Sequence, residues 1–237
     1  MLEARSDDLT ARVRIEPSRL RAWVSGYLRT LDRLLARAGL DLDRLVEQAR
    51  QAEPEFTTGL GGPLVPAATW RLPSHLPPTP GVARDLARLQ QVQLLLRSVP
   101  LAAPMADYKI NSRFGSRRDP MRRRAAMHTG IDFGGPRNAA VLATAPGEVV
   151  EAGRSGAYGI MVVVDHGMGL RTCYAHLAKA AVRVGAQVEA GQRVGTMGRT
   201  GRATGPHLHY EIRLDDRPLN PARFLEAGGQ LRQLVGG

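Results

Sequence analysis

The segment His207-Leu-His-Tyr-Glu-Ile-Arg-Leu214 alternates polar and apolar residues, which is the pattern of a half-buried β-strand. Side chains two positions apart in a strand point to the same face, so His207 and His209 lie together. Glu211 and Arg213 continue this polar face. The opposite face is apolar and is formed by Leu208, Tyr210 and Ile212. The segment therefore predicts a strand with one face in the core and one face carrying chemistry.

Two further segments carry histidine in similar surroundings. In His128-Thr-Gly-Ile-Asp132, both end residues can reach one ion if residues 129–133 are extended. In 170–176, the same alternation places Thr172, Tyr174 and His176 on one face, with Cys173 and Ala175 inward. A catalytic zinc usually takes three protein ligands, among them imidazoles and carboxylates, and keeps a fourth position for water. The combination, with histidines to spare for proton transfer, indicates a zinc hydrolase.

Each of these patterns is weak when taken alone. A single histidine in a strand is more often a hydrogen-bonded structural group, and the zinc-protease helix motif HExxH is absent. Three such elements in a chain with six histidines favour the metal site. His75, in a proline-rich stretch, and His166, at a turn after a strand, are not counted as ligands.

A longer set of motifs runs in order through residues 110–225, roughly half of the chain. They are Asn111-Ser-Arg-Phe-Gly-Ser-Arg117, Met127-His-Thr-Gly-Ile-Asp-Phe133, Ala145-Pro-Gly-Glu-Val-Val150, Val164-Asp-His-Gly167, Tyr174-Ala-His-Leu177, Gly198-Arg-Thr-Gly201, Thr204-Gly-Pro-His-Leu-His-Tyr-Glu211 and Asn220-Pro221. In these motifs the chain resembles the lysostaphin/LytM-type zinc metallopeptidases, which cleave peptide bonds in peptidoglycan. Their order and spacing make the resemblance highly specific.

The resemblance implies a role for each matching residue. The expected ligands of one zinc ion per chain are His128, Asp132 and His209. The expected catalytic pair is His176 and His207. Zinc activates a water for attack on the peptide carbonyl, and a neutral imidazole can take the proton of that water. We expect His176 to be this base and His207 to orient the water or stabilise the oxyanion, although the two roles could be exchanged.

Substrate contacts are expected from Tyr174, Asn111 and Arg117. Some members of the family have a tyrosine several residues before the first histidine ligand, whereas residues 119–127 of this chain contain none. Relatives that have lost activity, and that activate separate cell-wall amidases, generally lack zinc ligands. Such a regulator is the alternative to a peptidoglycan endopeptidase. No ligand is missing here, which argues for the endopeptidase.

The expected fold class is α+β, in two parts. Residues 1–105 form a helical region, with helices at 17–38, 42–52 and 82–99 and a Pro/Gly-rich segment at 53–80. Gly39 is placed to cap the first helix. In residues 106–237, short strands separated by glycine-containing turns predict a mostly antiparallel β domain, and the resemblance adds an open groove holding the zinc. The helices could inhibit the site, dock a protein partner or only pack.

The net charge of +11 indicates an anionic partner. Residues 106–237 carry 19 Lys/Arg against 11 Asp/Glu, and residues 1–105 carry 14 against 11. Peptidoglycan in an anionic bacterial wall suits this balance. Nucleic acid is not expected, because the chain has no helix-turn-helix or zinc-finger pattern. Cys173 is the only cysteine, so no intrachain disulfide forms.

The first residues lack the apolar core of a signal peptide, and no stretch of about 18 apolar residues predicts a transmembrane helix. The substrate implied by the resemblance nevertheless lies outside the cytoplasm. We therefore expect a periplasmic or extracellular location at the cell envelope, with a signal or anchor absent from this chain.

Overall fold

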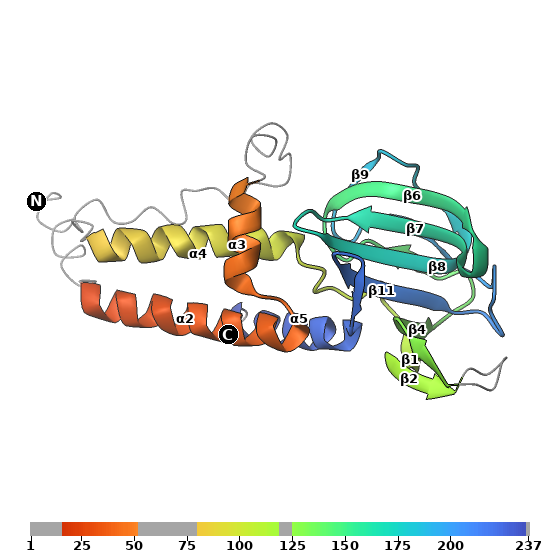
Figure 1. Ribbon diagram of the computed structural model, residues 1–237, viewed down its shortest axis with the longest axis horizontal. Coiled ribbons are helices and arrows are strands. Elements are labelled where there is room, and N and C mark those ends of the chain that lie inside the picture. Colours follow the sequence, from red (N-terminus) through yellow and green to blue (C-terminus); the bar gives the residue numbers. More distant parts are fainter. Residues whose placement is uncertain (1–15, 52–79, 119–124, 236–237) are drawn as a thin grey trace, which may run out of the picture.

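A computed structural model describes residues 16–51, 80–118 and 125–235. Four helices, α2 (Pro17–Ala38), α3 (Leu42–Gln51), α4 (Pro80–Ser98) and α5 (Pro221–Val235), flank an antiparallel sheet (Figure 1). The predicted α+β class is confirmed, with the helical region ahead of the sheet in the chain. No helix in the described ranges is both long and apolar enough to span a membrane.

The first helix begins and ends where its sequence predicts. Pro17 occupies the first turn, where the missing N–H costs nothing. Gly39 adopts φ +89°, which favours glycine because it has no Cβ. The N–H of Gly39 donates to the Ala36 carbonyl at 3.0 Å, and that of Leu40 donates to Leu35 at 2.9 Å. These two bonds form a Schellman motif that ends the helix.

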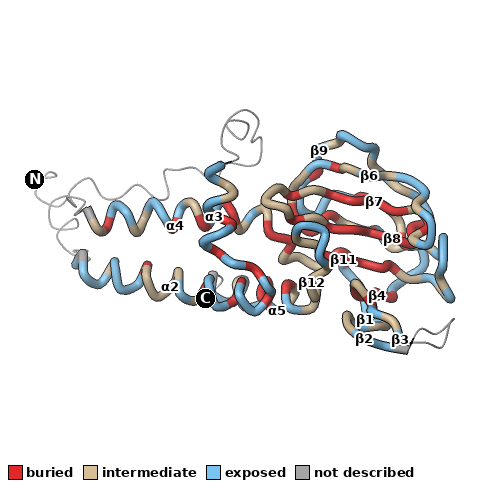
Figure 2. Tube along the Cα trace, viewed as in Figure 1, coloured by how far each residue is buried: buried red, intermediate tan, exposed pale blue. Residues whose placement is uncertain are grey.

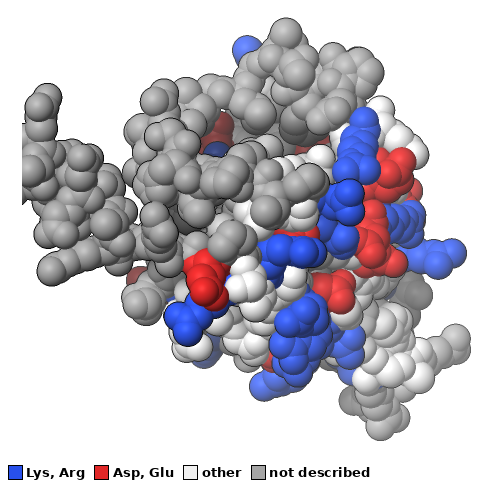
Figure 3. Space-filling view, turned by 90° about the vertical axis from the view of Figure 1, so that its left-hand side faces the viewer, with Lys and Arg blue, Asp and Glu red and all other residues white. Residues whose placement is uncertain are grey.

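The helical part is built from both ends of the chain. α2 packs against α4 and against α5, a helix that the sequence analysis did not predict. Ion pairs also join the helices, from Arg21 to Asp85 at 3.1 Å and from Arg88 to Asp43 at 2.5 Å. Viewed from this end, acidic and basic side chains lie interspersed on the described surface (Figure 3).

The sheet runs in the order β1-β4-β11-β8-β7-β6-β9 and remains open, with β10 pairing to β8 and β5, and β12 pairing to β11. Its strands are β1 (Lys109–Ser112), β4 (Ile131–Gly134), β5 (Ala140–Leu142), β6 (Gly147–Ser155), β7 (Gly159–Asp165), β8 (Leu170–Ala180), β9 (Gln187–Val188), β10 (Arg193–Met197), β11 (Leu208–Leu214) and β12 (Arg217–Leu219). A separate hairpin is formed by β2 (Gly115–Arg118) and β3 (Ala125–His128). The prediction of a mostly antiparallel β domain is confirmed.

One continuous apolar core joins the helices to the sheet. It runs from Leu31 and Leu35 of α2 to Tyr174 and Tyr210 in the sheet, all of them buried (Figure 2). The division into residues 1–105 and 106–237 stays a proposal. α5 belongs to the second part by sequence but packs against the first.

The register of β11 and β8 separates the described helices from the histidines. Leu214 pairs with Leu170 at the end of β11 that leads into β12 and α5, whereas His209 pairs with Ala175 near its start. Five residues of strand span about 17 Å. β12 and α5 therefore follow the end of β11 that lies away from His209. Figure 1 shows the described helices on that side of the sheet.

Candidate metal centre

Three adjacent strand ends bring the predicted ligands together. Asp132 of β4 pairs directly with His209 of β11, so their side chains emerge from neighbouring positions of one face. His128 is the last residue of β3. The sequence analysis made a shared ion conditional on an extended segment 129–133. In the structure only the part from Ile131 onward is a strand, because β4 begins there. The intervening turn brings His128 over the sheet.

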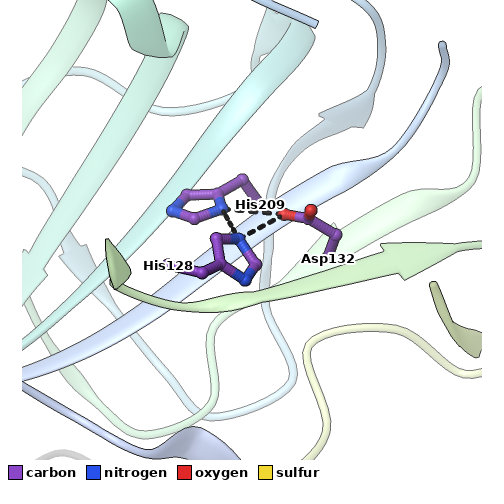
Figure 4. A group of neighbouring side chains, drawn as sticks. All are labelled: His128, Asp132 and His209. Atoms are coloured by element: carbon purple, nitrogen blue, oxygen red, sulfur yellow. Dashed lines mark hydrogen bonds and ion pairs between the residues drawn. The ribbon is translucent and has the colours of Figure 1, made fainter. Parts of the chain in front are cut away.

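The three donor atoms form a small triangle (Figure 4). His128 Nε2 lies 3.1 Å from Asp132 Oδ1, His209 Nδ1 lies 2.8 Å from the same oxygen, and the two nitrogens are 3.2 Å apart. A zinc ion about 2.0–2.1 Å from such atoms in a tetrahedron would hold them roughly 3.3 Å apart. Two imidazole nitrogens and one carboxylate oxygen also match zinc chemically. The cluster can hold a metal ion of this kind.

The two predicted catalytic histidines lie beside this triangle. The His176 ring is 4.7 Å from the His207 ring and 5.9 Å from the His209 ring, measured between centroids. His207 Nε2 lies 3.8 Å from Asp132 Oδ1. The structure thus gathers all five predicted metal and catalytic side chains into one place.

Each of the four imidazoles has one nitrogen anchored away from the triangle. Backbone carbonyls accept from Nδ1 of three rings: Arg113 from His128 at 2.7 Å, Thr200 from His176 at 2.8 Å, and Gly205 from His207 at 2.8 Å. Glu211 Oε1 lies 2.9 Å from His209 Nε2. Anchoring one nitrogen selects the tautomer and leaves the other nitrogen available as a ligand or a base.

The environment sets the charge of these groups. Burial raises the pKa of Asp132, but hydrogen bonds from His128 and His209 outweigh it, so the net pKa is well below the usual range. Burial lowers the pKa of His176 to about 4, against the raising effect of its bond to Thr200. At neutral pH, Asp132 is therefore ionised and His176 is neutral, which is the state that a general base requires.

The alternation in β8 was assigned to the wrong faces. Tyr174 pairs with Tyr210 and is fully buried, with its hydroxyl bonded to Thr144 and Thr172. Cys173 and Ala175 instead share the face of Glu211 and His209. The prediction that Tyr174 faces His176 and contacts substrate is therefore wrong.

The reason for this error is a local irregularity at His176. This residue has φ +58°, and the pairing of β7 with β8 shifts register between Ile160 and Val162, opposite Leu177 and Tyr174. A bulge breaks the two-residue period of the strand. His176 therefore points to the polar face, although the side chains two and four positions before it in β8 are buried in the core. A non-glycine residue at positive φ is strained, and such strain concentrates at functional sites.

The other two predicted substrate residues lie at the edge of the site. Arg117 Nη2 is 3.5 Å from Asp132 Oδ2, and 37% of its side chain is exposed. Asn111 is exposed at the bulge of β1 and lies against Gly134, rather than within the imidazole cluster. Residues 110–117 line a hollow beside the site. Their contact with substrate stays a prediction.

The remaining sequence predictions for this region have different outcomes. Residues 119–124, where the upstream tyrosine is missing, and His75 lie outside the described residues. His166 bonds to the Pro146 carbonyl and to Thr172, away from the triangle. The sequence analysis missed the surroundings of Glu211, because its partners Thr129 and Tyr158 come from distant segments.

Comparison with known proteins decides the family. The sequence profile of Peptidase family M23 matches residues 126–221, which contain all five clustered side chains. Residues 126–221 are a domain of peptidase family M23. The M23 part is 42% identical over 118 residues to the DD-carboxypeptidase/endopeptidase Mpg of Neisseria meningitidis, covering 50% of this chain and 27% of that protein. It is 43% identical over 114 residues to the peptidoglycan DD-endopeptidase ShyA of Vibrio cholerae, covering 48% and 26%.

The match thus spans about a quarter of the length of these curated relatives. Among solved structures, the M23 part is similar to the catalytic domain of lysostaphin from Staphylococcus simulans. The identity is 34%, the coverage is 50% of this chain and 92% of that one, and the TM-score is 0.47.

Proposed function

We propose that this chain is a zinc-dependent endopeptidase that hydrolyses peptide bonds in the cross-links or stem peptides of peptidoglycan. The observation that carries the proposal is the triangle of His128, Asp132 and His209 donor atoms, with edges of 2.8–3.2 Å, beside the imidazoles of His176 and His207. In this proposal the three residues of the triangle hold one zinc ion per chain.

In this proposal, each group of the site has its own role in hydrolysis. Zinc, when bound, lowers the pKa of a water and polarises the carbonyl under attack. His176 is the general base, because its Nδ1 donates to the Thr200 carbonyl and its Nε2 is left to accept a proton. His207, anchored in the same way at Gly205, has its Nε2 left to accept a hydrogen bond and orients the water; donation to the oxyanion would need a second proton on this ring. Asp132 supplies a single negative ligand, so the site keeps a net positive charge.

The substrate class rests on the relatives. Mpg is named a DD-carboxypeptidase/endopeptidase and ShyA a peptidoglycan DD-endopeptidase. These names favour bonds between D-amino acids as the target. The exposed guanidinium of Arg117 beside Asp132 would meet an acidic group of the stem peptide. Such a substrate implies action in the periplasm or elsewhere in the cell envelope. A non-catalytic regulator of an amidase is not favoured, because all three metal ligands and both catalytic histidines are present.

The test is digestion of purified sacculi by the zinc-loaded full chain, with products identified by mass spectrometry. Asp132→Asn keeps the shape of the side chain and removes its charge, and Asp216→Asn makes the same change at a side chain that is 76% exposed. We expect Asp132→Asn to lose bound zinc and at least 100-fold in rate, since one lost ligand contact of this kind costs about 3 kcal/mol or more. The Asp216 control should match the parent. Unchanged products and rate for Asp132→Asn would refute the proposal.

A further inference from the structure

His209 differs from the other three histidines in the group that anchors it. Backbone carbonyls hold His128, His176 and His207, whereas a carboxylate, Glu211, lies 2.9 Å from His209 Nε2. A carboxylate is a stronger hydrogen-bond acceptor than a carbonyl. It also makes the opposite ring nitrogen more basic and so a stronger ligand for a metal ion. That opposite nitrogen, Nδ1, is the one in the triangle.

Glu211 is fully buried, and both of its oxygens are satisfied. Oε1 accepts from His209, from the Tyr158 hydroxyl at 3.1 Å and from the Thr129 hydroxyl. Oε2 accepts from Arg213, through Nε at 2.7 Å and Nη2 at 2.6 Å. Because Oε2 pairs with the Arg213 guanidinium and every partner of Oε1 is a hydrogen-bond donor, Glu211 is held as an acceptor-only carboxylate.

The partners of Glu211 also hold each other. Arg213 Nη2 donates to the Tyr158 hydroxyl at 3.2 Å, with its guanidinium 6.0 Å from the centre of the Tyr158 ring. The Tyr158 ring lies 5.9 Å from the His209 ring. Arg213 compensates the buried negative charge, so the cluster costs less than an unpaired carboxylate would. Glu211 is consequently held at one position and presents one oxygen to His209.

We propose that Glu211 is a positioning residue of the metal centre, which fixes His209 with its proton on Nε2 and its Nδ1 directed at the metal. Thr129, Tyr158 and Arg213 hold Glu211 in place for this task. The inference rests on the proposed zinc site. Without Glu211, the Nε2–H group of a buried ring would lose its acceptor, and the ring would be free to turn about its Cβ–Cγ bond.

The first test measures zinc affinity by competition with a chromophoric chelator, using the full chain. Substitutions of carboxylates that orient metal-bound histidines weaken metal binding about 10–100-fold, so we expect this loss for Glu211→Ala. Tyr158→Phe removes a single bond to Oε1 and should weaken binding by a smaller factor. Glu148→Gln, at an exposed position of β6, is the control and should bind zinc like the parent.

The second test reads the tautomer directly, by long-range 1H–15N NMR of the histidine side chains in the zinc-loaded parent. We expect a protonated Nε2 and a metal-shifted Nδ1 for His209. This measurement needs no substitution and so stays informative if Glu211→Ala does not fold. A purely structural role would destabilise the metal-free variants while leaving zinc affinity and the tautomer unchanged.

The outcomes separate this inference from the proposed function. If the parent binds no zinc at His209, the proposed function fails. If the parent binds zinc but Tyr158→Phe and Glu211→Ala bind it equally well, or Nε2 proves to be the ligand, then Glu211 does not position His209 and only this inference is overturned.

Discussion

Replacing Tyr174 with phenylalanine would remove one hydroxyl from the centre of a buried polar chain. The Tyr174 hydroxyl lies 3.0 Å from Thr144 N, 3.1 Å from Thr144 Oγ1 and 3.0 Å from Thr172 Oγ1. Thr172 continues the chain to His166, and Thr144 continues it to Tyr210. All of these residues are buried, so water cannot take the place of the lost oxygen.

The cost follows from the partners that are left behind. The two threonine hydroxyls keep another partner each, so their lost bonds cost about 0.5–1.5 kcal/mol apiece. The Thr144 N–H loses the partner that the structure gives it, and an unsatisfied buried donor costs about 1–3 kcal/mol. We therefore expect Tyr174→Phe to lower the free energy of unfolding by about 2–6 kcal/mol. Cleavage of peptidoglycan by the folded variant should change little, because Tyr174 does not reach the imidazoles.

Urea unfolding of the metal-free chain, followed by far-ultraviolet circular dichroism, measures this loss. Tyr108→Phe serves as the control, since this residue is 41% exposed and the loss of its hydroxyl should shift the free energy by less than about 0.5 kcal/mol. A stable Tyr174→Phe variant with sharply reduced cleavage would refute the reasoning, because it would place the hydroxyl at the substrate.

Two further predictions concern pH and backbone conformation. Burial lowers the pKa of His166, against the raising effects of Pro146 and Asp165, so its proton binds more readily in the unfolded chain. The folded chain therefore loses stability as the pH falls below about 6.5, the pKa of a histidine in the unfolded chain. Between pH 7.5 and 5.5, the urea midpoint of His166→Gln should fall less than that of the parent. Gly201 has φ +70°, and an added Cβ would lie 2.3 Å from Gly159 N, next to the Thr200 carbonyl that anchors His176. Gly201→Ala should therefore lose both stability and cleavage activity. Gly191→Ala, at φ +81° in open space, is the control and should lower the free energy of unfolding by only about 1–2 kcal/mol while leaving cleavage intact. Equal cleavage activity of these two variants would contradict the anchoring role of Thr200.

The local patterns succeeded where a structure depends on its own sequence. α2 follows from its apolar spacing and from Gly39, and the apolar and polar faces of β11 follow from strict alternation. The strand is not half-buried as predicted, because both of its faces are buried from Leu208 to Ile212. α5 was missed because Gly228 and Gly229 interrupt its pattern and weaken the intrinsic helix propensity. In the structure, Gly228 packs so closely on Leu101 that a Cβ there would lie 2.1 Å from its carbonyl oxygen. This helix therefore depends on tertiary contact.

By itself, the sequence predicted which five side chains the fold brings together, since histidines and an aspartate recur in the spacing of a known family. It also predicted the mostly antiparallel sheet and the division of β11 into an apolar and a polar face. Only the tertiary structure decided the direction of Tyr174 and the surroundings of Glu211. The physical reason is that a bulge at His176 changes strand parity, and that hydrogen-bond partners from residues 129, 158 and 213 meet only when the strands pair.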